Sequence, residues 1–229
     1  MTAPRDPFLY PRGIKMPKHP TLTTGMVRRA LREGTYERRE AEAVLATVGA
    51  DDHVLELGGG IGFISTLMAV KRTPRQITVY EPNPGLHDYI RSVHAANGVS
   101  CATLCAGIVA ARTGPPVPFY VRRNLLASSL DRMPGAENIV HEVMVDQAGV
   151  ADVIATVKPT VLVCDIEGAE AHVLKAGDWS GLRAAIIELH PQLTGPSGVR
   201  AVFEAMHASG LTYFPKRSDA KVVTFLRDW

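Results

Sequence analysis

The 229-residue sequence contains little cysteine, and aromatic side chains make up only 6% of it. Its three cysteines, Cys101, Cys105 and Cys164, lie in apolar runs, and neither their odd number nor their spacing fits a disulfide framework or a zinc site. We therefore expect buried thiols in a reducing compartment. The formal net charge of +2 is small, so overall charge favours no particular partner.

The sequence also lacks a hydrophobic run long enough to cross a bilayer. Its N-terminus carries proline and charge where a secretory signal would need an apolar segment, so we expect a cytoplasmic protein without a membrane partner. Basic residues are concentrated near the N-terminus. They fit a nucleic-acid surface or a solvated helix face, and the second is favoured because no aromatic residues interleave with them.

What the sequence does contain is a regular alternation of apolar strands and helices. Strands are expected, in chain order, at residues 53–57, 77–80, 102–105, 160–164 and 184–189. Helices are expected between them, among others at residues 84–96 and 199–208. This alternation predicts an α/β fold with a doubly wound, mostly parallel sheet covered on both faces. Residues 211–214 and 222–226 are expected to close the sheet as an antiparallel pair.

Two segments depart from this alternation. Residues 1–48 are predicted to form an irregular, proline-rich arm or lid and then helices that are interrupted at Gly34. The main domain covers residues 49–229. Within it, residues 107–145 are predicted to form a β-hairpin excursion around a polar loop at residues 124–135, on the substrate side.

The most informative pattern is Val-Leu-Glu-Leu-Gly-Gly-Gly-Ile-Gly-Phe at residues 54–63. It is typical of a strand, a glycine-rich turn and a helix, whose backbone can approach a nucleoside-containing ligand. Gly58, Gly60 and Gly62 give the spacing G-x-G-x-G, whereas the dinucleotide fingerprint would need its third glycine at Phe63. No Walker lysine follows. S-adenosylmethionine has a ribose but no pyrophosphate, so it fits this loop better than NAD does. A glycine turn without a ligand is the alternative.

Two acidic residues agree with a cofactor loop. Glu81 ends the second strand about twenty residues after the loop, where a carboxylate can hold the hydroxyls of a ribose. Glu56 precedes the loop and is expected to support it or to bind the amino group of the cofactor's methionine. The expected cofactor is therefore S-adenosylmethionine, with backbone contacts from Gly58, Gly60 and Gly62.

A second group of acids, Asp165, Glu167 and Glu170, follows the fourth strand. Glu170 suits the dipole of the next helix, and we assign it that structural role. Asp165 and Glu167 have the chemistry to take a proton, hold a hydroxyl or amine, or bind a cation. Glu188 and His190 lie on one face at the end of the fifth strand. With Asp165 they fit an acid–base cluster, a metal site, or a histidine satisfied by a carboxylate.

These motifs together resemble the FkbM-type family of S-adenosylmethionine-dependent methyltransferases over roughly residues 34–190. The shared segments are Gly-Thr-Tyr-Glu at 34–37, the glycine loop at 54–62, Tyr-Glu-Pro-Asn-Pro at 80–84, Leu-Val-Cys-Asp-Ile-Glu-Gly-Ala-Glu at 162–170 and Glu-Leu-His-Pro at 188–191. The run at 162–170 is the most specific of them. The chain departs from the family at Gly59 and Gly60, where Ala-Asn is frequent, and at Glu56, where aspartate is frequent.

The resemblance implies a class I methyltransferase fold with a seven-stranded sheet. It also implies methyl transfer from a sulfonium to an oxygen, less often a nitrogen, of a sugar or another small-molecule acceptor. We expect Asp165 to flank cofactor and acceptor, and His190, helped by Glu188, to act as the base. Substrate-binding residues are expected at the entrance and in the acceptor pocket, the latter shaped by the excursion together with the N-terminal arm: Tyr36, Glu37, Asn124, Ser128 and Glu167, with Ser129 beside them. No metal ligand is assigned.

Other functions stay open at this point. An N-methyltransferase, or an RNA or protein methyltransferase docking through the basic N-terminal segment, would share the fold, and the nucleic-acid enzyme would bind in a salt-sensitive way. A non-catalytic nucleoside-binding protein would bind the cofactor without turnover. An NAD-dependent oxidoreductase is disfavoured by Phe63. The acceptor, the need for a divalent metal and the oligomeric state are not determined by the sequence.

Overall fold

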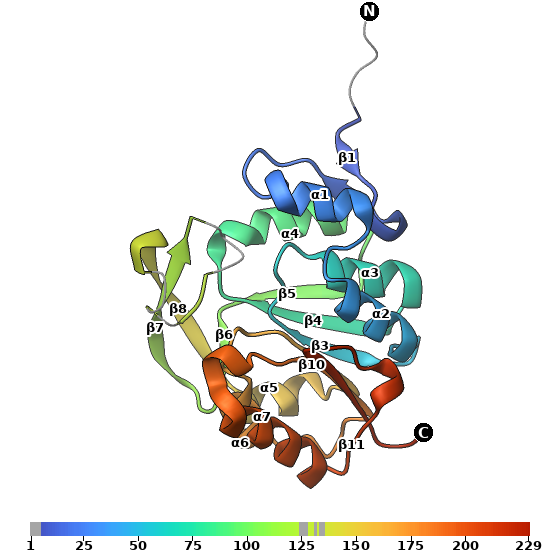
Figure 1. The fold of residues 1–229 in the computed structure, drawn as a ribbon, viewed down its shortest axis with the longest axis vertical. Coiled ribbons are helices and arrows are strands. Elements are labelled where there is room, and N and C mark those ends of the chain that lie inside the picture. The colour runs from blue at the N-terminus through green and yellow to red at the C-terminus, as the bar shows by residue number, and fades with distance from the viewer. Residues whose placement is uncertain (1–5, 124–127, 131, 133–135) are drawn as a thin grey trace, which may run out of the picture.

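The computed structural model describes residues 6–123, 128–130, 132 and 136–229. At its centre lies a seven-stranded sheet with helices on both faces (Figure 1). From one edge to the other, the strands are β11 (Thr212–Tyr213), β12 (Val222–Leu226), β10 (Ala184–Glu188), β9 (Val161–Cys164), β3 (His53–Leu57), β4 (Gln76–Glu81) and β5 (Ala102–Ala106). Strand β12 runs antiparallel to β10 and β11, and the other neighbours are parallel. The predicted mostly parallel α/β sheet is confirmed.

Side chains alternate between the two faces of the sheet and build a core on each. Val54 and Leu55 of β3 belong to opposite cores, as do Ala184 and Ala185 of β10. One core is covered by α1 (Gly25–Glu33), α2 (Arg38–Thr47), α3 (Phe63–Arg72) and α4 (Pro84–Ala96). The other is covered by α5 (Val150–Val157), α6 (Glu170–Ala176) and α7 (Pro191–Ala208). In the part of the chain that the structure describes, no helix is long and apolar enough to cross a membrane.

Local signals located several elements correctly. The strand His53–Leu57 and the helix Pro84–Ala96 have their predicted bounds. Asn83 caps the latter helix, because its side-chain oxygen accepts a hydrogen bond of 3.0 Å from the Gly85 N–H. Helix α7, however, starts well before the predicted residue 199, since its helical turns continue through a kink at Gly195, where φ is 64°.

The residues after β5 form a second, three-stranded sheet in the order β6 (Ile108–Ala110), β8 (Ile139–Gly149) and β7 (Gly114–Arg122). Strands β7 and β8 pair antiparallel, which confirms the predicted hairpin. Phe119, Val121 and Val145 give this sheet a small core of its own. Most of the predicted polar loop lies outside the described residues.

The N-terminal segment corrects the expectation of an irregular arm. Strands β1 (Phe8–Leu9) and β2 (Met16–Pro17) form a two-stranded antiparallel sheet, and Ile14 between them is fully buried. The Tyr89 hydroxyl of α4 donates a hydrogen bond of 2.7 Å to the Pro17 carbonyl. The segment is ordered against the core because its apolar side chains are buried there. None of residues 6–20 lines the cavity at the carboxyl ends of the strands, so this proline-rich stretch is not a lid there.

Candidate active site

A cavity of about 820 Å³ opens at the carboxyl ends of the parallel strands, where the loops after β3, β4 and β9 meet. This is also where the strand order reverses, because β4 and β9 lie on opposite sides of β3. Ligands of open α/β sheets bind at such switch points. The second sheet contributes to the wall through Ile108 of β6 and Phe119 of β7, and Ser128, beyond the end of β7, lines the cavity as well. The cavity is within the size range of small-molecule sites.

The glycine loop touches the neighbouring strand end through its backbone. Gly58 has a φ of 88°, and a Cβ atom there would lie 1.8 Å from the carbonyl oxygen of Asp165. Gly60 lines the cavity, and its N–H donates a hydrogen bond of 2.9 Å to Glu81 Oε2. Gly62 lies outside the cavity wall, where a Cβ atom would approach Ile90 to 3.1 Å. Gly58 and Gly60 therefore face the ligand space, whereas Gly62 lets α3 pack closely against α4.

Glu81 is the last residue of β4 and is 5% exposed. Its second oxygen, Oε1, accepts a hydrogen bond of 2.7 Å from the Asn83 N–H. Burial raises the pKa of Glu81 to about 7, against the opposing effect of the hydrogen bonds from Asn83 and Gly60. Each carboxylate oxygen has two lone pairs, so both keep one for hydroxyls of a ligand in the cavity.

Glu56 is even more deeply buried, with 2% of its surface exposed, and it also lines the cavity. Its Oε2 atom is buried and has no hydrogen-bond partner among the described residues. Burial, and then the nearby carboxylates of Glu37 and Glu81, raise the pKa of Glu56 well above its ordinary value. A buried acceptor without a donor is costly, so this position fits a ligand that brings a donor or a positive charge.

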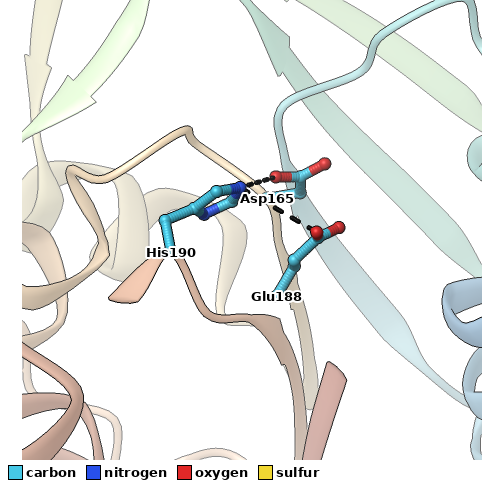
Figure 2. Close-up of side chains that lie close together, drawn as sticks. All are labelled: Asp165, Glu188 and His190. Carbon is cyan, nitrogen blue, oxygen red and sulfur yellow. Dashed lines mark ion pairs between the residues drawn. The ribbon is translucent and has the colours of Figure 1, made fainter. Parts of the chain in front are cut away.

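The second polar cluster combines β9 and β10 (Figure 2). Nε2 of His190 lies 3.6 Å from Asp165 Oδ1, 3.4 Å from Glu167 Oε2 and 3.9 Å from Glu188 Oε1. Asp165 and Glu167 line the cavity, whereas His190 is 3% exposed and lies behind them. The structure thus brings together the three residues expected to be catalytic, with Asp165 as the member that faces the cavity.

Glu170 holds the other side of the imidazole. Its Oε1 atom lies 2.8 Å from His190 Nδ1 and accepts a hydrogen bond of 3.0 Å from the Gly168 N–H. Burial alone would raise the pKa of Glu170, but these two bonds lower it. Burial alone would lower the pKa of His190, yet Glu170, Asp165 and Glu167 raise it. Sequence reasoning gave Glu170 only a helix-dipole role, because its partner is distant in the chain.

Asp165 is poorly compensated by comparison. Its Oδ1 atom is buried and has no hydrogen-bond partner among the described residues. Burial, followed by the charges of Glu188 and Glu167, raises the pKa of Asp165 to about 8. Burial alone would raise the pKa of Glu188, but its hydrogen bonds with Glu40 and Lys221 lower it below its ordinary value. Several acids thus compete for few counter-charges.

Two further acids reach the cavity from the start of α2. Glu37 lies near the glycine loop, because its Oε1 atom is 3.8 Å from the Cβ position of Gly60. Desolvation raises the pKa of Glu37 to about 8, although its hydrogen bond with Tyr36 opposes the shift. Desolvation and a hydrogen bond with Glu188 raise the pKa of Glu40 to about 8. Sequence reasoning named Tyr36 and Glu37 and missed Glu40, whose link to β10 has no local signal.

Ser128 is one of the residues expected to shape the acceptor pocket. It is 9% exposed and lines the cavity, and its hydroxyl oxygen accepts a hydrogen bond of 3.0 Å from the Arg122 N–H. The Asn83 side-chain amide approaches the same oxygen to 3.4 Å. Ser129 also lines the cavity. Asn124 lies outside the described residues.

No family model matches the chain, and no curated protein matches it either. Among solved structures, it is similar to precorrin-6y C5,15-methyltransferase from Geobacter metallireducens, with 12% identity, a TM-score of 0.47 and coverage of 83% of this chain and 88% of that one. A methyltransferase from Pyrococcus furiosus is 14% identical, with a TM-score of 0.47 and coverage of 93% and 89%. TYW2 from M. jannaschii, in complex with AdoMet, is 12% identical, with a TM-score of 0.44 and coverage of 83% and 72%.

The fold itself rests on the strand order and strand directions. They give a seven-stranded, mostly parallel, Rossmann-like sheet with one antiparallel strand near its edge and a β insertion.

Proposed function

We propose that the protein is an S-adenosylmethionine-dependent methyltransferase that methylates an oxygen of a small-molecule or sugar-containing acceptor. The observation that carries the proposal is the hydrogen bond between the Gly60 N–H and Glu81 in the wall of a cavity that also holds Asp165. It joins the glycine loop and the expected ribose acid to the expected catalytic cluster. The motifs shared with FkbM-type enzymes support the same assignment, and membership in that family is part of the proposal.

The residues present fit the cofactor. Gly58 and Gly60 present backbone to the cavity, since a Cβ atom at Gly58 would meet the Asp165 carbonyl oxygen and Gly60 has a φ of 51°. The oxygens of Glu81 are oriented by two N–H donors and retain lone pairs for the ribose hydroxyls. The unpartnered oxygen of Glu56 is suited to the ammonium group of the methionine end. S-adenosylmethionine supplies, when bound, a methyl group made electrophilic by its sulfonium.

The protein's own groups then have to orient and deprotonate the acceptor. Asp165 faces the cavity and is the group placed to accept a hydrogen bond, and then the proton, from an acceptor hydroxyl. His190 and Glu188 act through Asp165, because His190 lies behind the cavity wall. This differs from the expectation that His190 is the base itself. Tyr36, Glu37, Ser128 and Glu167 line the same cavity and are proposed to bind the acceptor's polar groups.

The test is a calorimetric titration of the protein with S-adenosylmethionine and, separately, with NAD. We expect micromolar binding of S-adenosylmethionine, no comparable binding of NAD, and a loss of roughly tenfold or more in Glu81→Gln, since the variant cannot offer a charged acceptor to the ribose. Glu204→Gln, an exposed change on α7, is the matched control and should bind like the wild type. Binding of NAD in preference, or equal binding by Glu81→Gln, would contradict the proposal. A screen of hydroxylated acceptors follows a positive result.

A further inference from the structure

The cluster at the ends of β9 and β10 has donor atoms at spacings that suit coordination better than hydrogen bonding. One carboxylate oxygen each from Asp165 and Glu188 and one ring nitrogen of His190 lie within 4.8 Å of one another. The distances from His190 Nε2 to the Asp165, Glu167 and Glu188 oxygens are 3.6, 3.4 and 3.9 Å. Charge-assisted hydrogen bonds are about 2.7–2.9 Å long. The nitrogen is therefore surrounded by carboxylates that do not close on it.

The two ring nitrogens of His190 have different surroundings, and Nε2 is the one that is not hydrogen-bonded to Glu170. Nδ1 lies 2.8 Å from Glu170 Oε1, and Glu170 is only 1% exposed. A ring that donates its Nδ1–H to a buried carboxylate presents the Nε2 lone pair to the opposite side, in this protein toward the other acids. Histidines that bind metals almost always donate their second N–H to a carboxylate or carbonyl in this way. Glu170 thus prepares Nε2 as a ligand.

An independent observation comes from Asp165. Its Oδ1 atom, the one nearest to His190 Nε2, is buried and has no hydrogen-bond partner among the described residues. Such an atom calls for a donor or a cation. Lys221 contacts Glu188 from the protein side, but the carboxylates of Asp165 and Glu167 have no comparable lysine or arginine partner within the described residues.

We propose that Asp165, Glu188 and His190, with Glu167 as a fourth donor, form a binding site for one divalent cation. One imidazole nitrogen with carboxylate oxygens is a mixed donor set that suits Mn²⁺ better than Mg²⁺, which prefers oxygen alone. Because Asp165 and Glu167 line the cavity, the ion would face the space assigned to the acceptor. Its role there, to hold and acidify the acceptor oxygen, rests on the proposed function, whereas its binding does not.

The competing explanation is that a protonated His190 alone balances the carboxylates and no ion binds. Titration of the metal-free protein with Mn²⁺, followed by calorimetry without S-adenosylmethionine, separates the two. We expect one Mn²⁺ per chain with micromolar affinity and weaker binding of Mg²⁺. Asp165→Asn and Glu167→Gln should each weaken Mn²⁺ binding roughly tenfold or more. Asp88→Asn, an exposed carboxylate on α4, should leave it unchanged.

Pulsed electron paramagnetic resonance of the bound Mn²⁺ identifies the nitrogen ligand. A ¹⁴N coupling in the wild type that disappears in His190→Gln supports the site, and Mn²⁺ bound without nitrogen coupling overturns it. Circular dichroism reports whether each variant is folded, and Glu167→Gln keeps the test decisive because its side chain is 45% exposed. The absence of Mn²⁺ binding, or unchanged affinity in both carboxylate variants, also overturns the site. Binding of S-adenosylmethionine measured on the same samples fails or succeeds separately, so the two proposals are distinguishable.

Discussion

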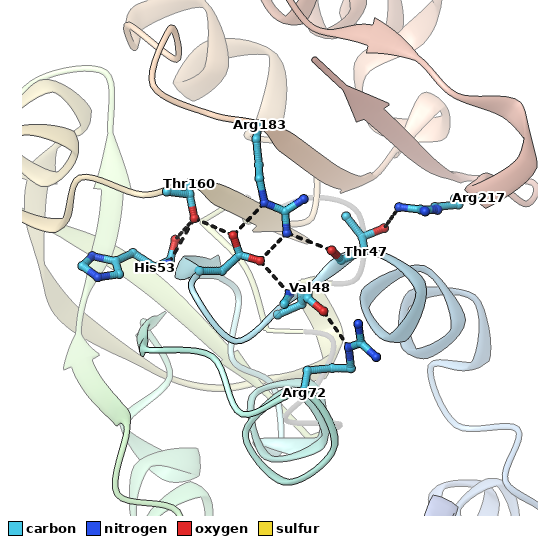
Figure 3. A network of polar contacts seen from close by, with 9 residues as sticks. Thr47, Val48, His53, Arg72, Thr160, Arg183 and Arg217 are labelled. Atoms are coloured by element: carbon cyan, nitrogen blue, oxygen red, sulfur yellow. Dashed lines mark hydrogen bonds and ion pairs between the residues drawn. The ribbon is translucent and has the colours of Figure 1, made fainter. Parts of the chain in front are cut away.

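Each end of the central sheet carries an aspartate, Asp52 at one end and Asp165 at the other, and the two carboxylates have different sets of partners. Asp52 stands just before β3, at the amino ends of the parallel strands, and its partners Thr160 and Arg183 are labelled in Figure 3. Its carboxylate accepts hydrogen bonds from Arg183 Nε at 2.7 Å, from the Thr160 hydroxyl at 2.8 Å and from the Gly49 N–H at 2.7 Å. Burial alone would raise the pKa of Asp52, but these partners lower it.

Asp165 stands at the opposite end, just after β9, and has one oxygen without a partner and a raised pKa. Burial alone would raise the pKa of both carboxyls, so the opposite directions of the two shifts come from their partners. The complete network of Asp52 ties together the starts of three strands through Thr160 and Arg183 and serves stability. The incomplete cluster of Asp165 is the pattern expected where a ligand supplies the missing partner.

The largest effect on stability is expected from the close backbone contact between Gly58 and Asp165. In Gly58→Ala the new Cβ atom would lie 1.8 Å from the Asp165 carbonyl oxygen, at a φ of 88°. We expect a loss of about 4 kcal/mol or more in the free energy of unfolding, measured by urea denaturation. Gly181→Ala is the control, because its Cβ would meet nothing closer than 3.9 Å, and should change stability little. Normal stability of Gly58→Ala would show that this loop adjusts freely.

The second largest effect is expected from breaking the hydrogen-bond network of Asp52. Asp52→Ala removes the carboxylate partner of a half-buried Arg183, which keeps its hydrogen bond to the Thr47 carbonyl, so we expect a loss of roughly 3 kcal/mol of unfolding free energy near neutral pH. The folded pKa of Asp52 lies below its ordinary value of 3.8, so its contribution is present above that pH and is lost as the pH falls through the folded pKa. Asp51→Ala, whose side chain is fully exposed, is the control. If Asp52→Ala and Asp51→Ala were equally stable, the network around Asp52 would not contribute to stability.

The pH dependence of cofactor binding tests the role of the Glu81 carboxylate, which lies at the same end of the sheet as Asp165. The pKa of Glu81 is raised to about 7. Because the ionised form accepts both ribose hydroxyls, affinity should be full above that pH and fall by up to roughly tenfold per pH unit below it. Calorimetry across this range measures the slope, and Glu81→Gln should flatten it. A wild-type affinity that is independent of pH would argue against ribose binding by Glu81.

The smallest effect on stability is expected from Asp165→Asn, and its sign is the opposite of that for Asp52→Ala. Removing one of several neighbouring carboxylates relieves repulsion, so the free energy of unfolding should stay the same or rise by up to about 1 kcal/mol. Urea denaturation measures it. Any acceptor found by screening should be methylated at least roughly 100-fold more slowly. A clear loss of stability with full activity would show that Asp165, like Asp52, serves stability and not catalysis.

Sequence reasoning succeeded where the signal is local. The bounds of Pro84–Ala96 follow from a capping asparagine, an N-terminal proline and an apolar periodicity within one segment. The separation between the glycine loop and Glu81 reflects one strand–helix–strand unit, and the structure joins the two by a hydrogen bond. The start of α7 was missed because Gly195 and Pro196 look like a break, whereas the helical turns continue through a kink there.

Sequence reasoning was silent where partners come from distant segments. The hydrogen bond between Glu170 and His190 and the one between Glu40 and Glu188 join elements that no local pattern relates. Burial decides whether a carboxylate in such a pair is charged, and burial is a property of the packed chain. The order of His190 behind Asp165, which changes the candidate for the base, depends on it as well.

By itself, the sequence determined the alternation of strands and helices, the glycine loop and the acids that end the strands, because periodicity and turn chemistry act over a few residues. Only the tertiary structure decided which of these acids meet. Strand β9 lies between β3 and β10, which brings Asp165 against the glycine loop on one side and against Glu188 and His190 on the other. Asp52 is fully hydrogen-bonded at one end of the sheet, whereas Asp165 has an unpartnered oxygen at the other. The difference arises because neighbouring strands bring hydrogen-bond donors to Asp52 and acidic residues to Asp165.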